Sequence, residues 1–414
     1  MNRSIVILVM AEEKWEEADF LRQQIELIGH RAKILDMGLT GSSQGVCQIS
    51  REEVISASGR PHEEVLSVTD RGKRMPIMVD GGIQIVRKLF DEGELSGIIS
   101  VGGTTGTRMG SSIMKSLPFG FPKLAVSSTA ALPGLSSRYI GTADITLMHS
   151  VIEFAGLNDL LRNVLARAAG AICAMVESGE RVPIQLPEKG NKPLIAMTHF
   201  GPSEECAVHV RKLLEEKGWQ VIGFSAAGIG DRAMEEIIES KDIFGAVIDL
   251  TPGGVGEELF GFSRKAGPTR LEAAGKKNLP QVIAPCSVNF GSPLKKNYLP
   301  EYDQRKKYVY DSARTFVRLS EEELIQVADV IAEKLNRSGG PVKVVIPLGG
   351  WSSVDKRGTP FYDANLDRIF VDQLKKKLSS AIEVREVDAD LETLEFASAV
   401  VQAFEDIMPK EVIH

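Results

Sequence analysis

The sequence predicts an α/β protein with mainly parallel sheets, made of two Rossmann-like subdomains with a cleft between them. Short β-branched runs alternate with longer stretches of helical period, as in parallel strands joined by crossover helices. The chain has 414 residues, too many for one ordinary core. A stretch rich in proline and charge, Glu180–Lys192, is the expected linker. We therefore expect subdomains at 1–184 and 192–414.

In the first half, an apolar strand at Ile5–Met10 leads into a helix at Glu13–Gly29. Leu21, Ile25 and Ile28 recur at helical spacing in it, and Gly29 is a typical helix end. The other elements expected in this half are a strand at Ala32–Leu35, a polar excursion over 38–75, a helix at Gly82–Glu92, strands at Gly97–Val101 and Leu124–Ser127, and a long helix over 157–179.

The second half opens in the same way as the first. Its expected strands are Leu194–Met197, Val221–Phe224, Ala246–Leu250, Gln281–Ala284, Lys343–Pro347 and Glu383–Glu386, with helices over 203–217, 230–240, 364–378 and 393–407. Gly97–Ser128 and Phe244–Ser287 share one order of elements: strand, Thr/Gly loop, helix, proline and strand. Two halves of one plan predict a ligand in the cleft between them.

The composition limits the partners. The formal net charge is −7 and no long basic run stands out, which argues against nucleic acid or an anionic membrane as the main partner. The first apolar run is too short for a signal peptide, and the helix over 157–179 is interrupted by charges. None of the four cysteines forms a C-x-x-C pair, so reduced thiols are expected. We expect a cytoplasmic protein.

The best-marked candidate site is the loop SVGGTTGTRMG at Ser100–Gly110, where a buried strand ends. Its glycines let a ligand approach the backbone, its threonines offer hydroxyl donors, and the next helix directs free N–H groups to the same place. It is neither a Walker A loop nor G-x-G-x-x-G. We predict a phosphate site; a tight turn capped by threonines is the alternative. The predicted binding residues are Gly102, Gly103, Thr104, Thr105, Gly106 and Thr107, with Arg108 as an added charge.

Four more polar residues end strands of the same half. Asp36 occupies the place where an acidic residue commonly meets a ribose hydroxyl, although a solvated turn aspartate would look the same. Ser127, Ser128 and Thr129 end a neighbouring strand, where ligands of open α/β sheets gather, but they are also good caps for the next turn.

Three residues are candidates for catalysis. Asp144 precedes an apolar segment and suits a catalytic or magnesium-linked carboxylate, or a helix cap. His199 follows a strand in MTHFG, where a base or a structural hydrogen-bond donor would fit. Asp355 lies in a third Gly-rich strand end, LGGWSSVD, facing the cleft or forming an ordinary polar loop.

The sister loop of the second half is a weaker anion site. It runs TPGGVGEEL, and Glu257 and Glu258 at the start of its helix would repel phosphate. A sugar or a metal-bound group remains an alternative there.

Five segments carry a family resemblance over most of the chain. They are VGGTTGT (Val101–Thr107), LPFGFPKLAVSS (Leu117–Ser128), YIGTADIT (Tyr139–Thr146), GPTRLEAAGK (Gly267–Lys276) and PLGGWSSVDKRGTPFYD (Pro347–Asp363). With them the chain resembles the uncharacterised bacterial, fungal and plant family whose known member is the tomato mosaic virus resistance protein, through that protein's N-terminal ATP-binding domain.

The resemblance implies two Rossmann-like subdomains, a homodimer, and ATP with Mg²⁺. In the plant protein this domain binds and inhibits a viral replication protein. The chain departs from the family pattern at Gly349, where a basic residue is usual, and at Tyr310 and Asp311, where a His-Asn pair is usual. The stretch between Cys286 and Asn289 also looks shorter.

We expect a nucleotide-binding protein with ATP as its nucleotide, and an ATP-dependent enzyme as a weaker extension by fold analogy. One alternative is a two-Rossmann glycosyltransferase or epimerase that uses a nucleotide-sugar. Another is an ATP-loaded module that binds an unidentified protein without turnover. The reaction and the metal ligands are not defined by the sequence.

Overall fold

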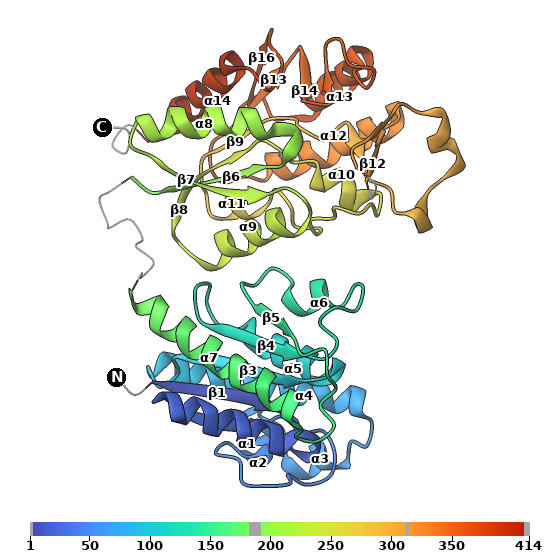
Figure 1. The fold of residues 1–414 in the computed structure, drawn as a ribbon. Helices are drawn as coiled ribbons and strands as arrows, with labels where there is room; N and C mark the ends of the chain where they lie inside the picture. Colours follow the sequence, from blue (N-terminus) through green and yellow to red (C-terminus); the bar gives the residue numbers. More distant parts are fainter. Residues whose placement is uncertain (1–2, 182–191, 312–313, 410–414) are drawn as a thin grey trace. The chain divides into compact units, whose positions relative to one another are not determined.

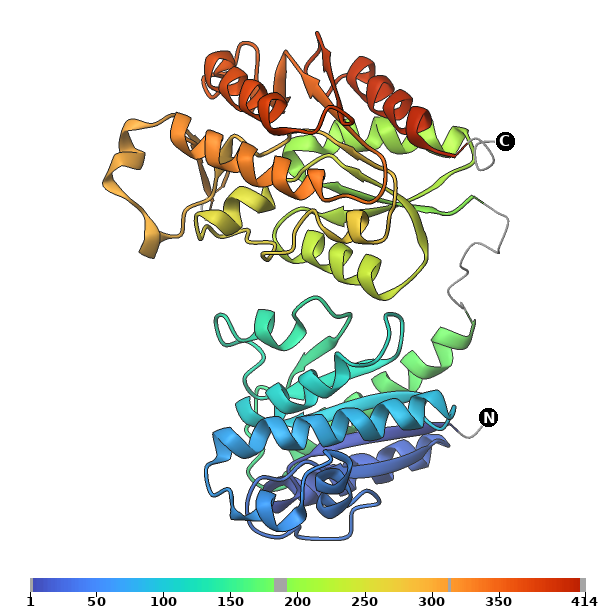
Figure 2. The same cartoon turned by 180° about the vertical axis from the view of Figure 1, so that it is seen from behind.

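The computed structural model describes residues 3–181, 192–311 and 314–409. The chain forms two compact units, which we call unit 1 (Met1–Gln185) and unit 2 (Leu186–His414) (Figure 1 and Figure 2). Each unit is built on a mainly parallel sheet, so the predicted α/β class is confirmed. Helix α7 (Asp159–Arg181) covers the start of the predicted linker, and 182–191 lie outside the described residues. The cleft stays a prediction.

Unit 1 contains a five-stranded sheet of parallel neighbours in the order β2-β1-β3-β4-β5. The chain goes from β1 outward to β2 and then returns to β3 on the other side of β1, so the winding reverses between β1 and β3. The strands are β1 Ser4–Val9, β2 Arg31–Asp36, β3 Gly97–Gly102, β4 Lys123–Ser127 and β5 Thr146–His149.

Helices cover both faces of this sheet (Figure 1 and Figure 2). Side chains alternate across β1, so Ile5 and Ile7 pack with α1 and α7, whereas Val6 and Leu8 pack with α2, α4 and α5. The helices are α1 Ala11–Ile28, α2 Arg51–Ala57, α3 His62–Ser67, α4 Arg71–Asp91, α5 Thr104–Met114, α6 Ser136–Ile140 and α7.

One prediction for unit 1 was wrong. The excursion over 38–75 contains α2 and α3, and α4 begins at Arg71 rather than at Gly82. Asp70 caps α4 by accepting hydrogen bonds from its first N–H groups, and Pro76 lies inside the helix. A Cβ atom on Gly81 would lie 1.9 Å from the carbonyl oxygen of Val54, so glycine permits the close approach of α2 and α4. The sequence reads as a helix break because both features usually interrupt helices.

Unit 2 repeats the plan with six strands in the order β16-β13-β9-β8-β6-β7, all parallel. Its winding reverses between β6 and β8 for the same reason as in unit 1. The strands are β6 Leu194–His199, β7 Gln220–Ser225, β8 Phe244–Asp249, β9 Gln281–Ile283, β13 Val342–Pro347 and β16 Glu383–Val387.

In unit 2, α8 and α14 pack on one face of the sheet, and α9, α12 and α13 on the other. The helices are α8 Glu204–Glu216, α9 Ile229–Ser240, α10 Gly254–Leu259, α11 Ala273–Lys276, α12 Glu321–Asn336, α13 Ala364–Lys377 and α14 Leu394–Ile407. Two small antiparallel sheets join β10 Phe290–Gly291, β12 Thr315–Arg318 and β11 Lys307–Val309, and β14 Gly350–Ser352 with β15 Asp355–Lys356. Among the described residues, we find no helix with the length and apolar character needed to span a bilayer.

Candidate functional site

A cavity of about 590 Å³ lies at the carboxyl ends of β1 and β3, where the winding of unit 1 reverses. Open α/β sheets bind their ligands at this position. Met10 lines the cavity directly after β1, and the residues Gly102–Gly106 line it at the end of β3. Five of the predicted phosphate-loop residues therefore share one wall of one cavity.

The backbone of this loop is ready to donate hydrogen bonds. Helix α5 begins at Thr104, and the first N–H with a partner inside the chain is that of Thr107, which donates to the carbonyl oxygen of Gly103 at 2.9 Å. The N–H groups of Thr104, Thr105 and Gly106 have no hydrogen-bond partner among the described residues. They also carry the positive end of the α5 dipole, so the loop favours an anion.

Three hydroxyls of the predicted site face the protein instead of the cavity. Thr107 is fully buried, and its Oγ1 lies 2.8 Å from the carbonyl oxygen of Gly103 and 2.8 Å from Ser127 Oγ. Ser127 Oγ in turn accepts from the N–H of Thr129, and Thr129 bonds Tyr139. The predicted hydroxyl donors Thr107, Ser127 and Thr129 are thus corrected to interior contacts that fix the loop to β4.

Ser128 lies nearer to the cavity than its two neighbours. Its Oγ donates to Glu153 Oε2 at 3.0 Å, and Glu153 lines the cavity. A Cβ atom placed on Gly103 would lie 3.6 Å from Glu153 Oε1 and 3.7 Å from Ser128 Oγ. Lys14, also in the wall, donates to the carbonyl oxygen of Phe154. A carboxylate and an ammonium group therefore border the start of α5.

The side chains that line the cavity carry charges of both signs, with more positive than negative groups. Lys14, Arg71 and Arg108 face Glu13 and Glu153, and Arg71 pairs with Glu13 at 3.1 Å. This excess of positive charge suits an anionic ligand. Hydrogen-bond donors on the ligand could contact the two carboxylates.

The rest of the cavity wall is apolar, formed by side chains that the sequence reasoning missed. Met10, Leu39 and Met75 lie in the wall, with Gly72 beside Met75 at the start of α4. The sequence did not reveal that α4 begins before Gly82, because the segment before this glycine was predicted to be irregular. Met10 and the residues just after it had a usable signal, since the turn after a first parallel strand must lie at its carboxyl end.

Asp36 ends β2 as predicted, but its carboxylate is hydrogen-bonded to other groups of the protein. It is 1% exposed, and its oxygens accept hydrogen bonds from the N–H groups of Ala11 and Gly38, the hydroxyl of Ser43 and the Nε of Arg51. A ribose would have to displace these partners. We therefore correct the ribose role to a structural one: Asp36 fixes the loop after β2.

Asp144 lies at the opposite end of the sheet from the cavity. Its Oδ1 pairs with Lys123 Nζ at 2.5 Å, and its Oδ2 accepts from the N–H of Gly120 at 2.6 Å. Lys123 is the first residue of β4, so the pair is at the amino ends of the strands. Burial lowers the pKa of Lys123, and Asp144 opposes that shift. The catalytic role predicted for Asp144 is corrected to neutralising a buried lysine.

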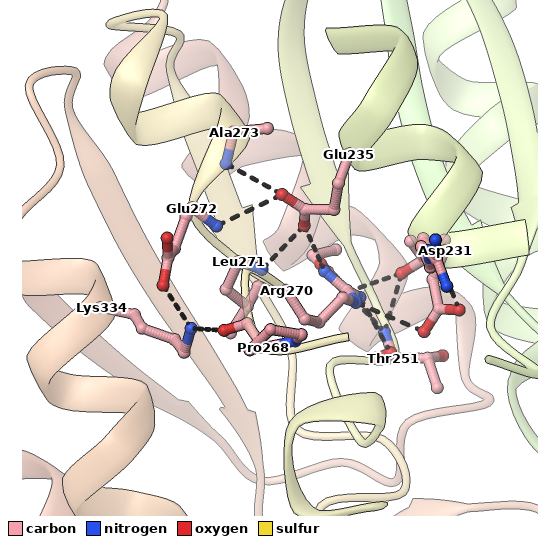
Figure 3. Close-up of polar contacts among 12 residues, drawn as sticks. Asp231, Glu235, Thr251, Pro268, Arg270, Leu271, Glu272, Ala273 and Lys334 are labelled. Atoms are coloured by element: carbon pink, nitrogen blue, oxygen red, sulfur yellow. Dashed lines mark hydrogen bonds and ion pairs between the residues drawn. The ribbon is translucent and has the colours of Figure 1, made fainter. Parts of the chain in front are cut away.

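The equivalent point of unit 2 is filled by a buried ion cluster (Figure 3). Arg270 is fully buried, and its guanidinium nitrogens lie 2.5 Å from an oxygen of Asp249, 3.0 Å from Glu235 and 3.3 Å from Asp231. Thr198 at the end of β6 donates to Asp249 at the end of β8 at 2.6 Å. Burial raises the pKa of Asp231 and of Glu235, and Arg270 opposes both shifts.

His199 and Asp355 both belong to unit 2. His199 ends β6, and its Nδ1 lies 2.9 Å from Glu204 Oε2. Asp355 is fully buried between Arg318 (2.9 Å) and Asn289 (2.6 Å). Asn289 also donates to Asp367, whose pKa is raised to about 7, mainly by burial. Asp355 therefore has partners in the interior of unit 2.

The residues that depart from the family pattern have neighbours within unit 2. A Cβ on Gly349 would lie 2.7 Å from the backbone nitrogen of Asp390, so a larger side chain does not fit there without movement. Tyr310 stacks on Phe316 with 5.3 Å between ring centroids, and Asp311 pairs with Arg314 at 2.5 Å.

Two Rossmann-like units, one with a cavity at its reversal point and one with that point filled, define an α/β protein of the doubly wound class. Within that class, the chain belongs to the uncharacterised protein family UPF0261. Residues 3–181 match the family's N-terminal domain and residues 192–408 match its C-terminal domain.

Relatives align along almost the whole chain, and the predicted resemblance is confirmed. A UPF0261 protein of Clostridium tetani is 36% identical over 99% of this chain and 100% of its own length. The ToMV resistance protein Tm-1(GCR237) of Solanum lycopersicum is 29% identical over 97% of this chain and 55% of its own length, so this chain spans about half of it. An uncharacterised Bacillus cereus structure shares 13% identity over 84% of this chain and 99% of its own, with a TM-score of 0.26, too low to bear on function.

Proposed function

We propose that this protein binds a nucleotide, ATP by expectation, with the phosphates on the loop between β3 and α5. The observation that carries the proposal is the set of three unpartnered N–H groups, at Thr104, Thr105 and Gly106, in the wall of a cavity at the reversal point. Phosphate oxygens are the groups that a helix start of this kind binds best. The choice of ATP over other nucleotides follows the family resemblance and stays a proposal.

The volume of the cavity supports a nucleotide ligand, and so does the presence of both apolar and charged side chains in its wall. A volume of about 590 Å³ is within the range of small-molecule sites, roughly 300–1,000 Å³. The apolar side chains of Met10, Leu39 and Met75 offer a wall for a base, and Arg71 and Arg108 offer charge for phosphates. We assign no reaction, and turnover is a question for a phosphate-release assay.

One pair of variants at Gly103 tests the proposal. Gly103 is the N-cap of α5 with φ −82° and ψ −156°, a backbone that any residue adopts. In Gly103→Asn, the side-chain oxygen accepts from the N–H of Thr105 or Gly106 and takes the place of a phosphate. We expect the free energy of unfolding to hold or rise by about 0.3 kcal/mol, because Asn is at least as good an N-cap as Gly. ATP affinity in calorimetry falls by about tenfold or more, since a charge-assisted hydrogen bond is lost.

Gly103→Ala is the matched control. Its methyl group meets Glu153 and Ser128 at 3.6 Å or more and leaves the loop N–H groups free. Alanine is a poor N-cap, so this variant is less stable and yet keeps ATP affinity within about threefold. Equal ATP binding by the Asn variant and the wild type contradicts the proposal. Tighter binding of a UDP-sugar than of ATP replaces it with the nucleotide-sugar alternative.

A further inference from the structure

Helix α4 carries a proline at a position where proline removes a hydrogen bond. Pro76 is the sixth residue of α4, beyond the first turn in which proline fits without loss. In a regular helix, the N–H of each residue donates to the carbonyl four residues earlier. Because proline has no N–H, the carbonyl oxygen of Gly72 loses the partner that the helix would give it. Among the described residues, no backbone N–H from outside the helix donates to this oxygen.

The backbone of Gly72 faces the cavity. Gly72 lines the cavity and has no side chain, so its main-chain atoms form that part of the wall. Its N–H is already used, because it donates to Asp70 Oδ1 at 2.7 Å. A helical carbonyl points along the axis toward the residues three and four positions further on, and Met75, three positions on, also lines the cavity. The free oxygen of Gly72 therefore lies beside Met75, on the side of α4 that borders the cavity.

The packing of α4 does not explain the proline. Pro76 is exposed, whereas the next two residues, Ile77 and Met78, are buried in the core. Proline is the least favourable residue in a helix interior, and it usually ends or kinks the helix. Here α4 continues to Asp91. The feature that remains is the carbonyl oxygen that Pro76 leaves free in the wall of the cavity.

The surroundings of this oxygen suit the edge of an aromatic base. Leu39 and Met75 line the same cavity, and an apolar side chain with a thioether beside it packs well on the face of a ring. Arg71, the charged neighbour of Gly72 on α4, is paired with Glu13 at 3.1 Å. A lone acceptor needs a donor on the ligand. Adenine presents a donor-only amino group at position 6, where guanine presents an oxygen.

We propose that the carbonyl oxygen of Gly72, left free by Pro76, accepts a hydrogen bond from the amino group of the bound base and so selects a 6-aminopurine nucleotide. The inference rests on the proposed nucleotide site, to which it adds the group that reads the base. Pro76 is a positioning residue, because it acts only by keeping the oxygen of Gly72 out of the helix ladder.

Calorimetric titration of the whole protein with two ligands tests the proposal. The first ligand is ATP, and the second is purine riboside triphosphate, which lacks only the 6-amino group of ATP. For the wild type we expect ATP to bind about fivefold more tightly, the usual effect of one neutral hydrogen bond.

Pro76→Ala returns an N–H to position 76, and this N–H donates to the carbonyl of Gly72. We expect the ATP affinity to fall by about fivefold and the affinity for the analogue to stay within about twofold, so the preference for ATP disappears. The melting temperature should hold or rise, because the helix gains a hydrogen bond. Slow hydrogen exchange of the new N–H shows that the bond has formed. A loss of affinity without a loss of stability separates this role from a structural one.

Pro61→Ala is the matched control. Pro61 is an exposed proline of the same unit, the N-cap of α3, and it does not line the cavity. Its replacement removes a proline without adding a donor near Gly72. We expect this variant to keep the preference of the wild type for ATP.

The outcomes separate this inference from the function on which it rests. Equal affinities of the wild type for the two ligands overturn the role of Gly72 and leave the nucleotide site standing. The same holds if Pro76→Ala keeps the preference for ATP, or weakens both ligands by one factor. Absence of binding of either ligand to the wild type overturns both proposals.

Discussion

The two units place a Thr/Gly loop at the same point of the same topology, but the surroundings of the loops differ: the loop of unit 1 lines a cavity of about 590 Å³, and a buried arginine lies against the loop of unit 2. In unit 1, Cβ atoms on Gly103 and Gly106 would meet their nearest neighbours at 3.6 and 3.5 Å, which is ordinary contact. In unit 2, a Cβ on Gly253 would lie 2.1 Å from Ser287 Oγ, and one on Gly254 would lie 2.7 Å from Asp231 Oδ2. The glycines of unit 1 border space, whereas those of unit 2 are packed against protein.

The difference is decided by residues far from the loops. Arg270 enters the reversal point of unit 2 from a segment about twenty residues beyond the loop and binds Asp249 and the carbonyl of Thr251. In unit 1, the N–H groups of Thr104 and Thr105 have no hydrogen-bond partner among the described residues. A Gly-rich loop at a strand end is thus open to a ligand in unit 1. In unit 2, a charged side chain of the protein itself packs against the equivalent loop.

Removing the guanidinium of Arg270 is expected to have the largest effect on the difference between the two units. In Arg270→Met, the carboxylates of Asp231, Glu235 and Asp249 lose their common partner inside the protein. We expect unit 2 to lose about 3–5 kcal/mol of stability, the usual cost of leaving buried charges unpaired. Urea unfolding in a Trp15→Phe background reports unit 2 alone, because Trp219 and Trp351 both lie in it.

Arg232→Met is the matched control, an arginine of helix α9 paired with Glu236 on the surface (57% exposed side chain). We expect a change of less than about 1 kcal/mol there. Equal losses in the two variants would mean that the cluster of Arg270 contributes nothing beyond an exposed ion pair.

The pH dependence of stability sharpens the comparison, because the carboxylates with raised pKa values among the described residues all lie in unit 2. Burial raises the pKa of Asp367 to about 7, above its ordinary value of 3.8, so the folded state binds this proton more tightly than the unfolded state. The stabilisation is complete below about pH 4 and is lost as the pH rises through about 7. We expect the contribution of Asp367 to the unfolding free energy of unit 2 to fall by about 3 kcal/mol between these limits.

Asp367→Asn should flatten that slope, measured by urea unfolding at several pH values. Asp372→Asn, on the same helix α13 and with a side chain 65% exposed, should leave it as in the wild type. Equal slopes in the wild type and in Asp367→Asn would show that Asp367 does not change its protonation on unfolding in this range.

The sequence was sufficient for the architecture and for one wall of the candidate site. Alternating periods revealed β1 to β4 of unit 1, and the Gly/Thr run located the loop after β3, because both signals are local. The other walls come from segments that meet only in three dimensions, such as Arg71 and Glu153. Burial was also hidden: Thr107 and Asp36 look like ligand contacts in sequence, and their oxygen atoms are satisfied within the fold.

The smallest expected effect concerns the strained turn that carries Glu153 in unit 1. Val151→Gly removes a β-branched side chain from a φ of +64°, where glycine is at ease, and little packing is lost at 76% exposure. We expect a net gain of about 1 kcal/mol in unfolding free energy, since relief of left-handed strain exceeds the entropy that glycine adds to the unfolded chain. Val46→Gly is the control in the same unit, 80% exposed and without positive φ, and should lose about 0.5–1 kcal/mol by the entropy term alone. If scanning calorimetry finds the same sign for both, the turn at Val151 stores no strain, and the position of Glu153 owes nothing to it.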